Sequence, residues 1–179
     1  MVHPAILVFG DDVIVGGAKL IGGIIGKYHA YAIGKRKEDD IAVRKKIASE
    51  LSKARKKMVN LMGEYYEGKD KKTCIAIQKI IDEIDTFSND VDLSETGHIY
   101  PFFSIQKSIN EEQVKKLIEF DRTIIEKVQN VGIATGTIEN MLIEKREIDI
   151  NRELKKIKQY VIDGKNQYKD RRDFIRGLK

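Results

Sequence analysis

The chain has 179 residues, of which 41% are hydrophobic and 34% are charged. This length suits a single domain, and the composition is too apolar for a disordered chain. Two prolines argue against a loop-rich or all-β fold, and a single cysteine excludes a disulfide framework and any multi-cysteine metal site.

The net charge of +5 is unevenly distributed along the chain. Residues 41–72 and residues 151–179 each carry ten basic and four acidic side chains, whereas residues 73–100 carry one basic and six acidic side chains. Basic blocks of this kind can attract phosphate groups in nucleic acid or at an anionic membrane surface. We favour the simpler interpretation, in which they are solvated helix faces that pair with the acidic middle or with another subunit.

The first half of the chain predicts two helices. Apolar residues recur on one face over 38–66, and isoleucines at helical spacing predict a second helix over 71–87, antiparallel to the first because the connection is short. Residues 88–107 contain several turn formers and are expected to be irregular. The aromatic run at residues 99–103 is expected to plug the bundle core rather than form an exposed contact.

A third helix is expected to begin at Ser108, because Ser108 and Glu111 have the spacing of a capping box. Its apolar stripe is interrupted only by Asp121. Gly132 is expected to close this helix, and residues 132–136 to form a turn.

Thr137 is the expected N-cap of the last helix, which runs to about residue 175. Apolar residues there follow two series seven residues apart, offset by four: Ile143, Ile150 and Ile157, and Leu154, Val161, Tyr168 and Ile175. This heptad pattern fits both a self-associating coiled coil and ordinary packing within the chain, and Gly164 weakens it. We therefore predict an all-α bundle of about four main helices with a long C-terminal helix, formed by residues 38–179, after a glycine-rich segment of residues 1–37.

Residues 13–34 are the unusual part of the sequence, with six glycines, two lysines and no acid in 22 residues. As a helix they would be about 33 Å long, enough to cross a bilayer core. Apolar side chains would gather on one face, with glycines and lysines opposite. Each interior glycine costs roughly 0.8–1.0 kcal/mol relative to alanine, so a membrane, a tight helix contact or a partner must offset this cost.

Several interpretations of this segment stay open: a transmembrane helix, which Lys19 and Lys27 disfavour, an interfacial helix, or an element buried in the protein or in an oligomer. A fourth is a β-hairpin of residues 5–9 and 13–15. A cleaved signal peptide is not expected, because no basic stretch precedes the apolar run. The residues expected to contact a membrane or a second copy, which include a G-x-x-x-G pair, are Gly16, Lys19, Gly22, Gly23, Gly26, Lys27, Tyr28 and Tyr31.

The residue types needed for catalysis or metal binding do not occur in the required patterns. The stretch 22–28 is one residue too short for a phosphate-binding loop, and the three histidines and Cys74 lack metal-ligand spacing. Asp39 and Asp40 point about 100° apart on a helix and are interpreted as first-turn charges that suit its dipole. His29 is interpreted as a helix-border residue without a role. We expect no enzyme, no cofactor and no metal.

Two functions fit these features. The first is a non-enzymatic, membrane-proximal scaffold or assembly protein in the cytoplasm, which forms homo-oligomers and contacts an anionic membrane or a protein partner. The second, which fits less well because aromatic residues are sparse there, is a soluble nucleic-acid-binding protein that uses the basic faces 44–57 and 165–176. The residues expected to meet headgroups or phosphates are Lys35, Arg36, Lys37, Arg44, Lys45, Lys53, Arg55, Lys56, Arg171 and Arg172.

Overall fold

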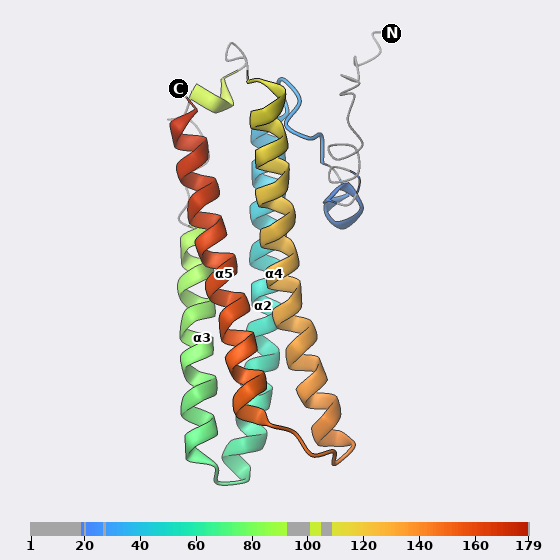
Figure 1. Cartoon of the computed structure of the whole chain (residues 1–179), viewed down its shortest axis with the longest axis vertical. Coiled ribbons are helices and arrows are strands. Elements are labelled where there is room, and N and C mark those ends of the chain that lie inside the picture. The colour runs from blue at the N-terminus through green and yellow to red at the C-terminus, as the bar shows by residue number, and fades with distance from the viewer. Residues whose placement is uncertain (1–18, 20, 27, 93–100, 105–108, 179) are drawn as a thin grey trace.

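The computed structural model describes residues 19, 21–26, 28–92, 101–104 and 109–178, and it confirms an all-helical bundle. Its four long helices are α2 (Arg36–Glu67), α3 (Lys71–Asp92), α4 (Glu111–Ile143) and α5 (Ile150–Gly177). Helices α2 and α3 form one antiparallel hairpin and α4 and α5 form another (Figure 1). The hairpins lie side by side, so that α2 also packs against α4 and α3 against α5.

The first hairpin follows the apolar periodicity closely. The expected helices over 38–66 and 71–87 are confirmed, and α3 continues to Asp92 because Val91 is buried. Asp70 begins α3 by accepting hydrogen bonds from the backbone N–H and the hydroxyl of Thr73, at 3.1 and 2.6 Å. These bonds satisfy part of the unpaired backbone at a helix start.

Helix α4 begins two residues later than expected. Its N-cap is Asn110, whose side chain accepts from the Gln113 N–H at 2.8 Å while the Gln113 side chain accepts from the Asn110 N–H at 3.0 Å. The motif is the expected capping box, but with an amide pair in place of Ser108 and Glu111. Asparagine caps a helix as well as serine does, and Glu111 then suits the positive end of the helix.

The expected helix end at Gly132 is wrong, and so is the N-cap at Thr137. Helix α4 runs through Gly132 and Gly136 to Ile143, because Val131, Thr135 and Ile138 are buried in the core on the same helix. Burial of these side chains outweighs the roughly 0.8–1.0 kcal/mol that each glycine costs. The real turn precedes the N-cap Asp149, and Lys145 adopts a left-handed φ of 51° in it.

The heptad stripe of α5 lies inside the bundle. Leu154, Ile157, Val161, Tyr168 and Ile175 are buried in the chain's own core. The pattern is therefore ordinary intramolecular packing, and the coiled-coil alternative through this stripe is wrong.

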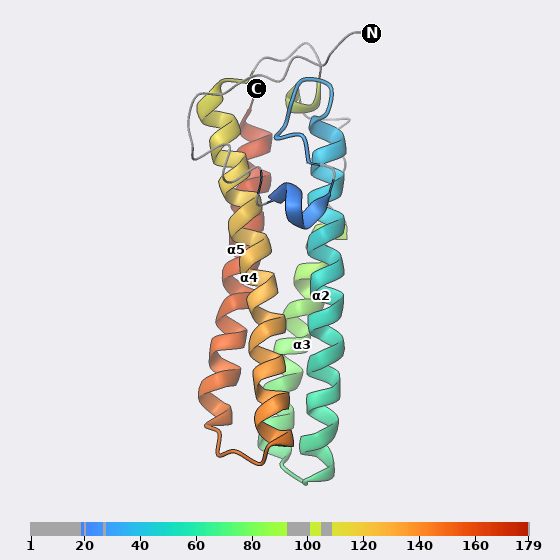
Figure 2. The same ribbon diagram turned by 90° about the vertical axis from the view of Figure 1, so that its right-hand side faces the viewer.

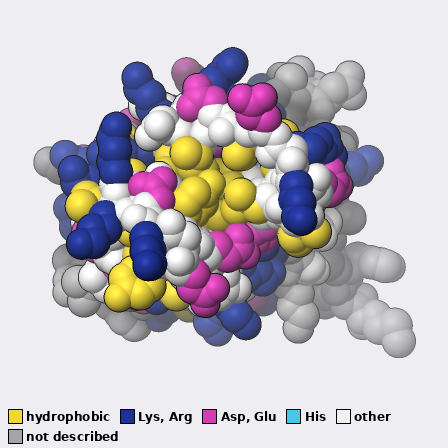
Figure 3. Space-filling model, turned by 90° about the horizontal axis from the view of Figure 1, so that it is seen from below, with side chains coloured by type: hydrophobic (Ala, Val, Ile, Leu, Met, Phe, Trp, Pro, Cys, Tyr) yellow, Lys and Arg dark blue, Asp and Glu magenta, His cyan; other side chains and the backbone are white. Residues whose placement is uncertain are grey.

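At the lower end of the bundle, hydrophobic side chains fill the space between the helices, inside a rim of charged side chains of both signs (Figure 3). Leu142, Ile148 and Ile150 are partly buried there and pack against the core. Ile143, at the end of α4, is 76% exposed and lies outside the stripe that the heptad pattern suggested.

The upper end is closed by an aromatic plug, as expected. Pro101–Phe103 forms a short 3₁₀ helix, and the Phe102 side chain is completely buried beneath it. The Arg36 guanidinium donates to the Phe102 carbonyl oxygen at 3.0 Å and lies 5.5 Å from the centre of its ring. Ile99 and Tyr100 lie outside the described residues.

The N-terminal segment does not form one continuous helix. Residue 19 and residues 21–25 are helical and lie across the face formed by α2 and α4 (Figure 2). Gly26 ends this short helix with a left-handed φ of 81°, and residues 28–35 are turns and irregular backbone. Within the described part of the chain, no helix is long and apolar enough to cross a membrane. Both strands of the alternative hairpin lie outside the described residues.

Candidate functional site beneath the N-terminal segment

Three helices bring charged side chains together in the interior of the bundle. Arg171 of α5 pairs through Nε with Asp121 of α4 at 2.6 Å and through Nη1 with Asp40 of α2 at 2.8 Å. Asp40 also accepts from Arg44 Nε at 3.1 Å. All but Arg44 are buried, so two carboxylates and two guanidinium groups balance one another at low solvent exposure.

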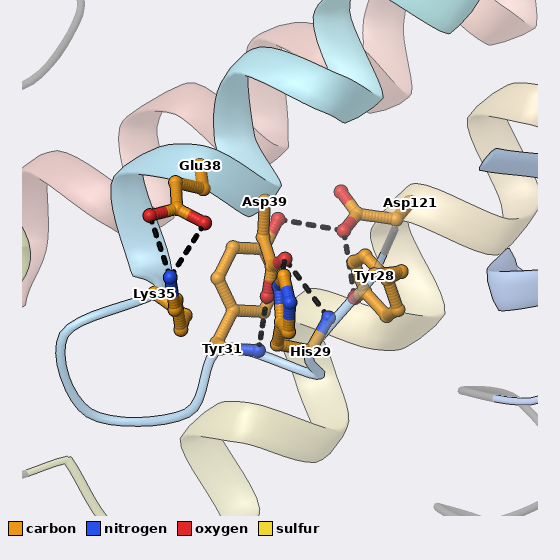
Figure 4. A network of polar contacts seen from close by, with 7 residues as sticks. All are labelled: Tyr28, His29, Tyr31, Lys35, Glu38, Asp39 and Asp121. Atoms are coloured by element: carbon orange, nitrogen blue, oxygen red, sulfur yellow. Dashed lines mark hydrogen bonds and ion pairs between the residues drawn. The ribbon is translucent and has the colours of Figure 1, made fainter. Parts of the chain in front are cut away.

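The N-terminal segment adds two tyrosine hydroxyls to these charges. Tyr28 and Tyr31 donate to the same Asp121 oxygen at 3.0 and 2.6 Å (Figure 4), and Arg171 Nη2 donates to the Tyr31 oxygen at 2.6 Å. The Tyr31 ring is buried and meets the Phe102 ring edge-on, with 5.8 Å between centroids. The Tyr31 hydroxyl is therefore bound to α4 and α5, and the Tyr31 backbone N–H donates to Asp39 of α2.

Asp39 holds the backbone of the same turn. It accepts the N–H of His29 at 2.9 Å and the N–H of Tyr31 at 2.7 Å, and its Oδ1 lies 2.9 Å from His29 Nδ1 (Figure 4). Ala30 and Tyr31 have left-handed φ values of 52° and 58°. Such a conformation costs roughly 1–2 kcal/mol for a residue with a Cβ, and these carboxylate contacts hold it in place.

Burial and neighbouring charges both act on the pKa values of the cluster formed by Tyr28, Tyr31, Asp40, Asp121 and Arg171. Burial raises the pKa of Asp121, although Arg171 and the two hydroxyls oppose the shift. Burial and the Asp121 charge raise the pKa of Tyr28 well above its ordinary value, and burial does the same for Tyr31 against the opposing effect of Arg171. Burial acts to lower the pKa of Arg171, but the neighbouring Asp121, Tyr31 and Asp40 raise it well above the ordinary value.

The hydrogen-bonding groups of this cluster are occupied by one another. Asp121 accepts from Arg171 and from two hydroxyls, while Arg171 donates to Asp121, Asp40 and Tyr31. Among the described residues, no group of three or more histidine, cysteine, aspartate or glutamate side chains is arranged to hold a metal ion. The arrangement is suited to anchoring the N-terminal segment on the bundle.

Two of the expected headgroup-contacting residues are in the interior. Arg171 is 2% exposed and Arg36 is 3% exposed, and burial lowers the pKa of Arg36. Both guanidinium groups are used inside the chain, so the expectation that they meet headgroups or phosphates is wrong. Sequence position near a basic block did not reveal that these two side chains point inward.

The other expected basic residues lie nearer the surface, and most contact acidic side chains. Lys35 pairs with Glu38 at 2.8 Å and Lys53 with Glu50 at 3.0 Å. Lys45 and Lys56 are exposed, Lys37 is half-buried, and the half-buried Arg172 lies 4.0 Å from Asp173.

The basic blocks also contact the acidic middle of the chain. Arg55 binds Asp85 through two nitrogens, at 2.6 and 3.2 Å, and Lys165 pairs with Glu83. These contacts join α2 to α3 and α5 to α3. They support the interpretation of the blocks as helix faces paired within the protein.

The expected contact residues of the N-terminal segment divide into two groups. Tyr31 is buried and Tyr28 is bound to Asp121, so both serve the bundle. Lys19, Gly23 and Gly26 are exposed and Gly22 is half-buried. Gly26 lies beyond the helix end, so the G-x-x-x-G pair does not share one helix face. Gly16 and Lys27 lie outside the described residues.

The cluster was not predicted, although the sequence carried a signal for it. Asp121 interrupts the apolar stripe of α4, and Arg171 continues the series 150, 157 and 164 in α5. Opposite charges at apolar register positions of two helices indicate a buried pair. Asp39 lies in the first turn of α2, as expected, and Asp40 follows it just beyond that turn; their main contacts are the turn of residues 28–31 and Arg171.

Comparison of the chain with models of protein families, with curated proteins and with solved structures finds no match. The function proposed below therefore depends on the cluster and on the surfaces of the described residues.

Proposed function

We propose that this chain is a non-enzymatic assembly protein that binds a second copy of itself through the outer side of its N-terminal segment. The supporting observation is the asymmetry of residues 21–25. Ile21 is fully buried, whereas a Cβ placed on Gly22 or Gly23 would have no atom of the described structure within 4 Å. The glycines thus leave a backbone surface that a second chain can approach closely.

The energetics of the short helix support the same proposal. A helix this short, with residues 19 and 21–25 described as helical, is not stable by itself in water, because nucleation costs more than so few hydrogen bonds return. Gly22 and Gly23 add roughly 0.8–1.0 kcal/mol each relative to alanine. Contacts on the inner side come from Ile21 and from the turn at residues 28–31. A second backbone on the outer side would use the space that the glycine residues leave.

The chemistry of the cluster supports a role without catalysis. Its carboxylates, guanidinium groups and hydroxyls are bound to one another, and their arrangement explains how the segment is held. The nucleic-acid alternative receives less support, because Arg55 and Lys165 bind acidic side chains of α3 and Arg171 is buried. An anionic membrane competes with a second copy as the partner of Lys19, and the experiment distinguishes them.

Sedimentation velocity over a range of protein concentrations tests the proposal. We expect the parent chain to self-associate, and we expect Gly22→Leu and Gly23→Leu to weaken association by roughly tenfold or more, because a large side chain separates the backbones. Gly63→Leu is the matched control, since Gly63 is also an exposed helical glycine with open space around its Cβ. Gly26 is unsuitable because its φ of 81° would strain leucine.

A parent chain that stays monomeric, or glycine variants that associate like the parent, would overturn self-association. Flotation of the protein with vesicles of phosphatidylserine and phosphatidylcholine then tests whether it binds a membrane. Binding that is lost in Gly22→Leu and Gly23→Leu, but kept in Gly63→Leu, would assign the outer surface to lipid instead of a second copy.

A further inference from the structure

We propose that the described residues 21–26 and 28–35 act as a strap that leaves and rejoins the bundle as a unit while the four helices stay folded. The inference rests on how charge, apolar burial and hydrogen bonds are divided between the strap and the bundle. It does not depend on what the outer side of the strap contacts.

The strap brings only uncharged groups to the charged side chains of the interior, apart from the imidazole of His29. Its contributions are the hydroxyls of Tyr28 and Tyr31 and the backbone N–H groups of His29 and Tyr31. Lys35 pairs with Glu38 at the surface, outside the cluster. The buried carboxylates and guanidinium groups therefore all belong to α2, α4 and α5.

The ion pairs of the cluster stay intact when the strap leaves. Arg171 retains Asp121 and Asp40, and Asp40 also retains Arg44, because none of these ion pairs includes a strap residue. Separation therefore keeps the ion pairs of the cluster. The buried Asp39 loses its bonds to the N–H groups of His29 and Tyr31, but the same movement uncovers its carboxylate to water, so it is not left as an unpaired buried charge. Water can then reach Asp121, whose pKa burial raises in the docked state.

The apolar attachment of the strap is narrow. Ile21 and Tyr31 are its only fully buried residues among those described, and Ile33 is 60% exposed. Ile21 and Tyr31 belong to the core that the four helices form, and Ile24, Ile25, Tyr28 and Ala30 are partly buried against it, but most of the core side chains come from α2, α3, α4 and α5. Local opening of this kind has a lower free energy than global unfolding, because it exposes much less apolar surface.

The strap is joined to α2 by an exposed turn. Residues 32–35 are exposed, and the turn bonds are local: the Ala32 N–H to the His29 carbonyl at 3.1 Å and the Lys35 N–H to the Ala32 carbonyl at 2.9 Å. Gly34 has a φ of 81°, a conformation that glycine adopts without steric cost. This turn can serve as the hinge, since its contact with α2 is the exposed pair of Lys35 with Glu38.

Native-state amide exchange of the full chain, read residue by residue by NMR, tests the proposal. The N–H groups of His29 and Tyr31 donate to the Asp39 side chain, so their exchange reports separation of the strap. We expect them to exchange faster than the core amides of Ile124 and Ile125, with little dependence on denaturant. Exchange of all four amides at one rate, with one denaturant dependence, would overturn the proposal.

A variant provides a second measurement. The double change Tyr28→Phe and Tyr31→Phe removes both hydroxyl bonds to Asp121 and keeps the rings. We expect the amide exchange rates at positions 29 and 31 to rise at least about tenfold. The amide exchange rates of Ile124 and Ile125 should stay unchanged. Tyr160→Phe is the control, because Tyr160 is half-buried on α5 outside the cluster.

The proposal fails if the double variant leaves strap exchange unchanged, or if it accelerates exchange in α4 to the same extent. If the double variant does not fold, the denaturant dependence of amide exchange in the parent chain still tests the proposal. Self-association is measured separately by sedimentation, so failure of either proposal is recognised independently of the other.

Discussion

Asp121 occupies a position in α4 where the surrounding stripe is apolar, and it receives three hydrogen bonds there. Its partners, Arg171, Tyr28 and Tyr31, come from α5 and from the N-terminal segment. A buried ion pair often stabilises a fold no more than apolar side chains of the same volume would. We infer that Asp121 mainly specifies where the segment docks, because an apolar side chain could not receive both tyrosine hydroxyls.

Removing the cation of the cluster should be costly. Arg171→Met leaves Asp121 buried without its cation and Asp40 with Arg44 alone. We expect a loss of about 3–5 kcal/mol in the free energy of unfolding, measured by urea denaturation. Arg172→Met, one residue later and half-buried, should cost less than about 1 kcal/mol. Equal losses in both variants would contradict this role for Arg171.

The buried tyrosines predict a fall in stability at alkaline pH. The pKa values of Tyr28 and Tyr31 are raised in the folded chain, so above about pH 10 the folded chain keeps protons that the unfolded chain has lost. Stability should therefore be lost as pH rises above that value. We expect Tyr28→Phe with Tyr31→Phe to flatten this slope in urea denaturation between about pH 9 and about pH 11. An unchanged slope would show that other groups cause it.

Among the helices, some glycines lie within a helix without interrupting it and another ends a helix, depending on the packing around each one. Gly132 and Gly136 lie within α4 without ending it, and Lys57 uses the space beside them by donating to the Gly132 carbonyl oxygen at 3.1 Å. Gly26 ends the short N-terminal helix through its left-handed φ. Gly164 lies under the Phe87 ring, where the two hairpins meet. The residue type is the same, and the packing around it decides the outcome.

Gly164→Ala and Gly63→Ala should therefore change stability in opposite directions. A Cβ at Gly164 would lie 3.2 Å from Phe87 Cε1, and the Phe87 ring is fully buried. We expect crowding to cost about 1–3 kcal/mol there and to exceed the gain of up to about 1 kcal/mol in helix propensity. Gly63 has open space, so its alanine variant should gain up to about 1 kcal/mol. Thermal unfolding followed by circular dichroism measures both, and stabilisation by Gly164→Ala would contradict the predicted crowding.

At the scale of the whole molecule, the cluster ties the two hairpins together at the end where the N-terminal segment docks. Arg171 joins α5 to α4 within one hairpin and to α2 of the other, and Tyr31 lies over all three helices. The opposite end has no counterpart to this cluster among the described residues, and apolar side chains pack there inside a mixed charged rim (Figure 3). The two ends are thus stabilised in different ways.

Deleting residues 1–35 should leave a folded bundle of lower stability. Most of the core is contributed by the four helices, while Ile21 and Tyr31 are lost and Phe102 loses a cover. We expect helix-rich circular dichroism and a single cooperative urea transition at a lower midpoint. A truncated chain without cooperative unfolding would show that the segment is an obligatory part of the core.

The sequence alone determined the helices wherever their periodicity was uninterrupted. The 3.6-residue repeat of apolar side chains is a local property of the backbone, so α2, most of α3 and the inward stripe of α5 could be identified from it. The glycine content of residues 13–34 likewise showed that contacts elsewhere must hold that segment, because glycine lowers helix propensity in any context.

The tertiary structure decided what no local pattern contains. Whether Gly132 ends a helix depended on the burial of its neighbours, and whether Arg171 meets solvent depended on Asp40 and Tyr31, which lie 131 and 140 residues away in the chain. A charge is stable in the interior only when its partner arrives from another element, and that meeting is set by how the helices pack.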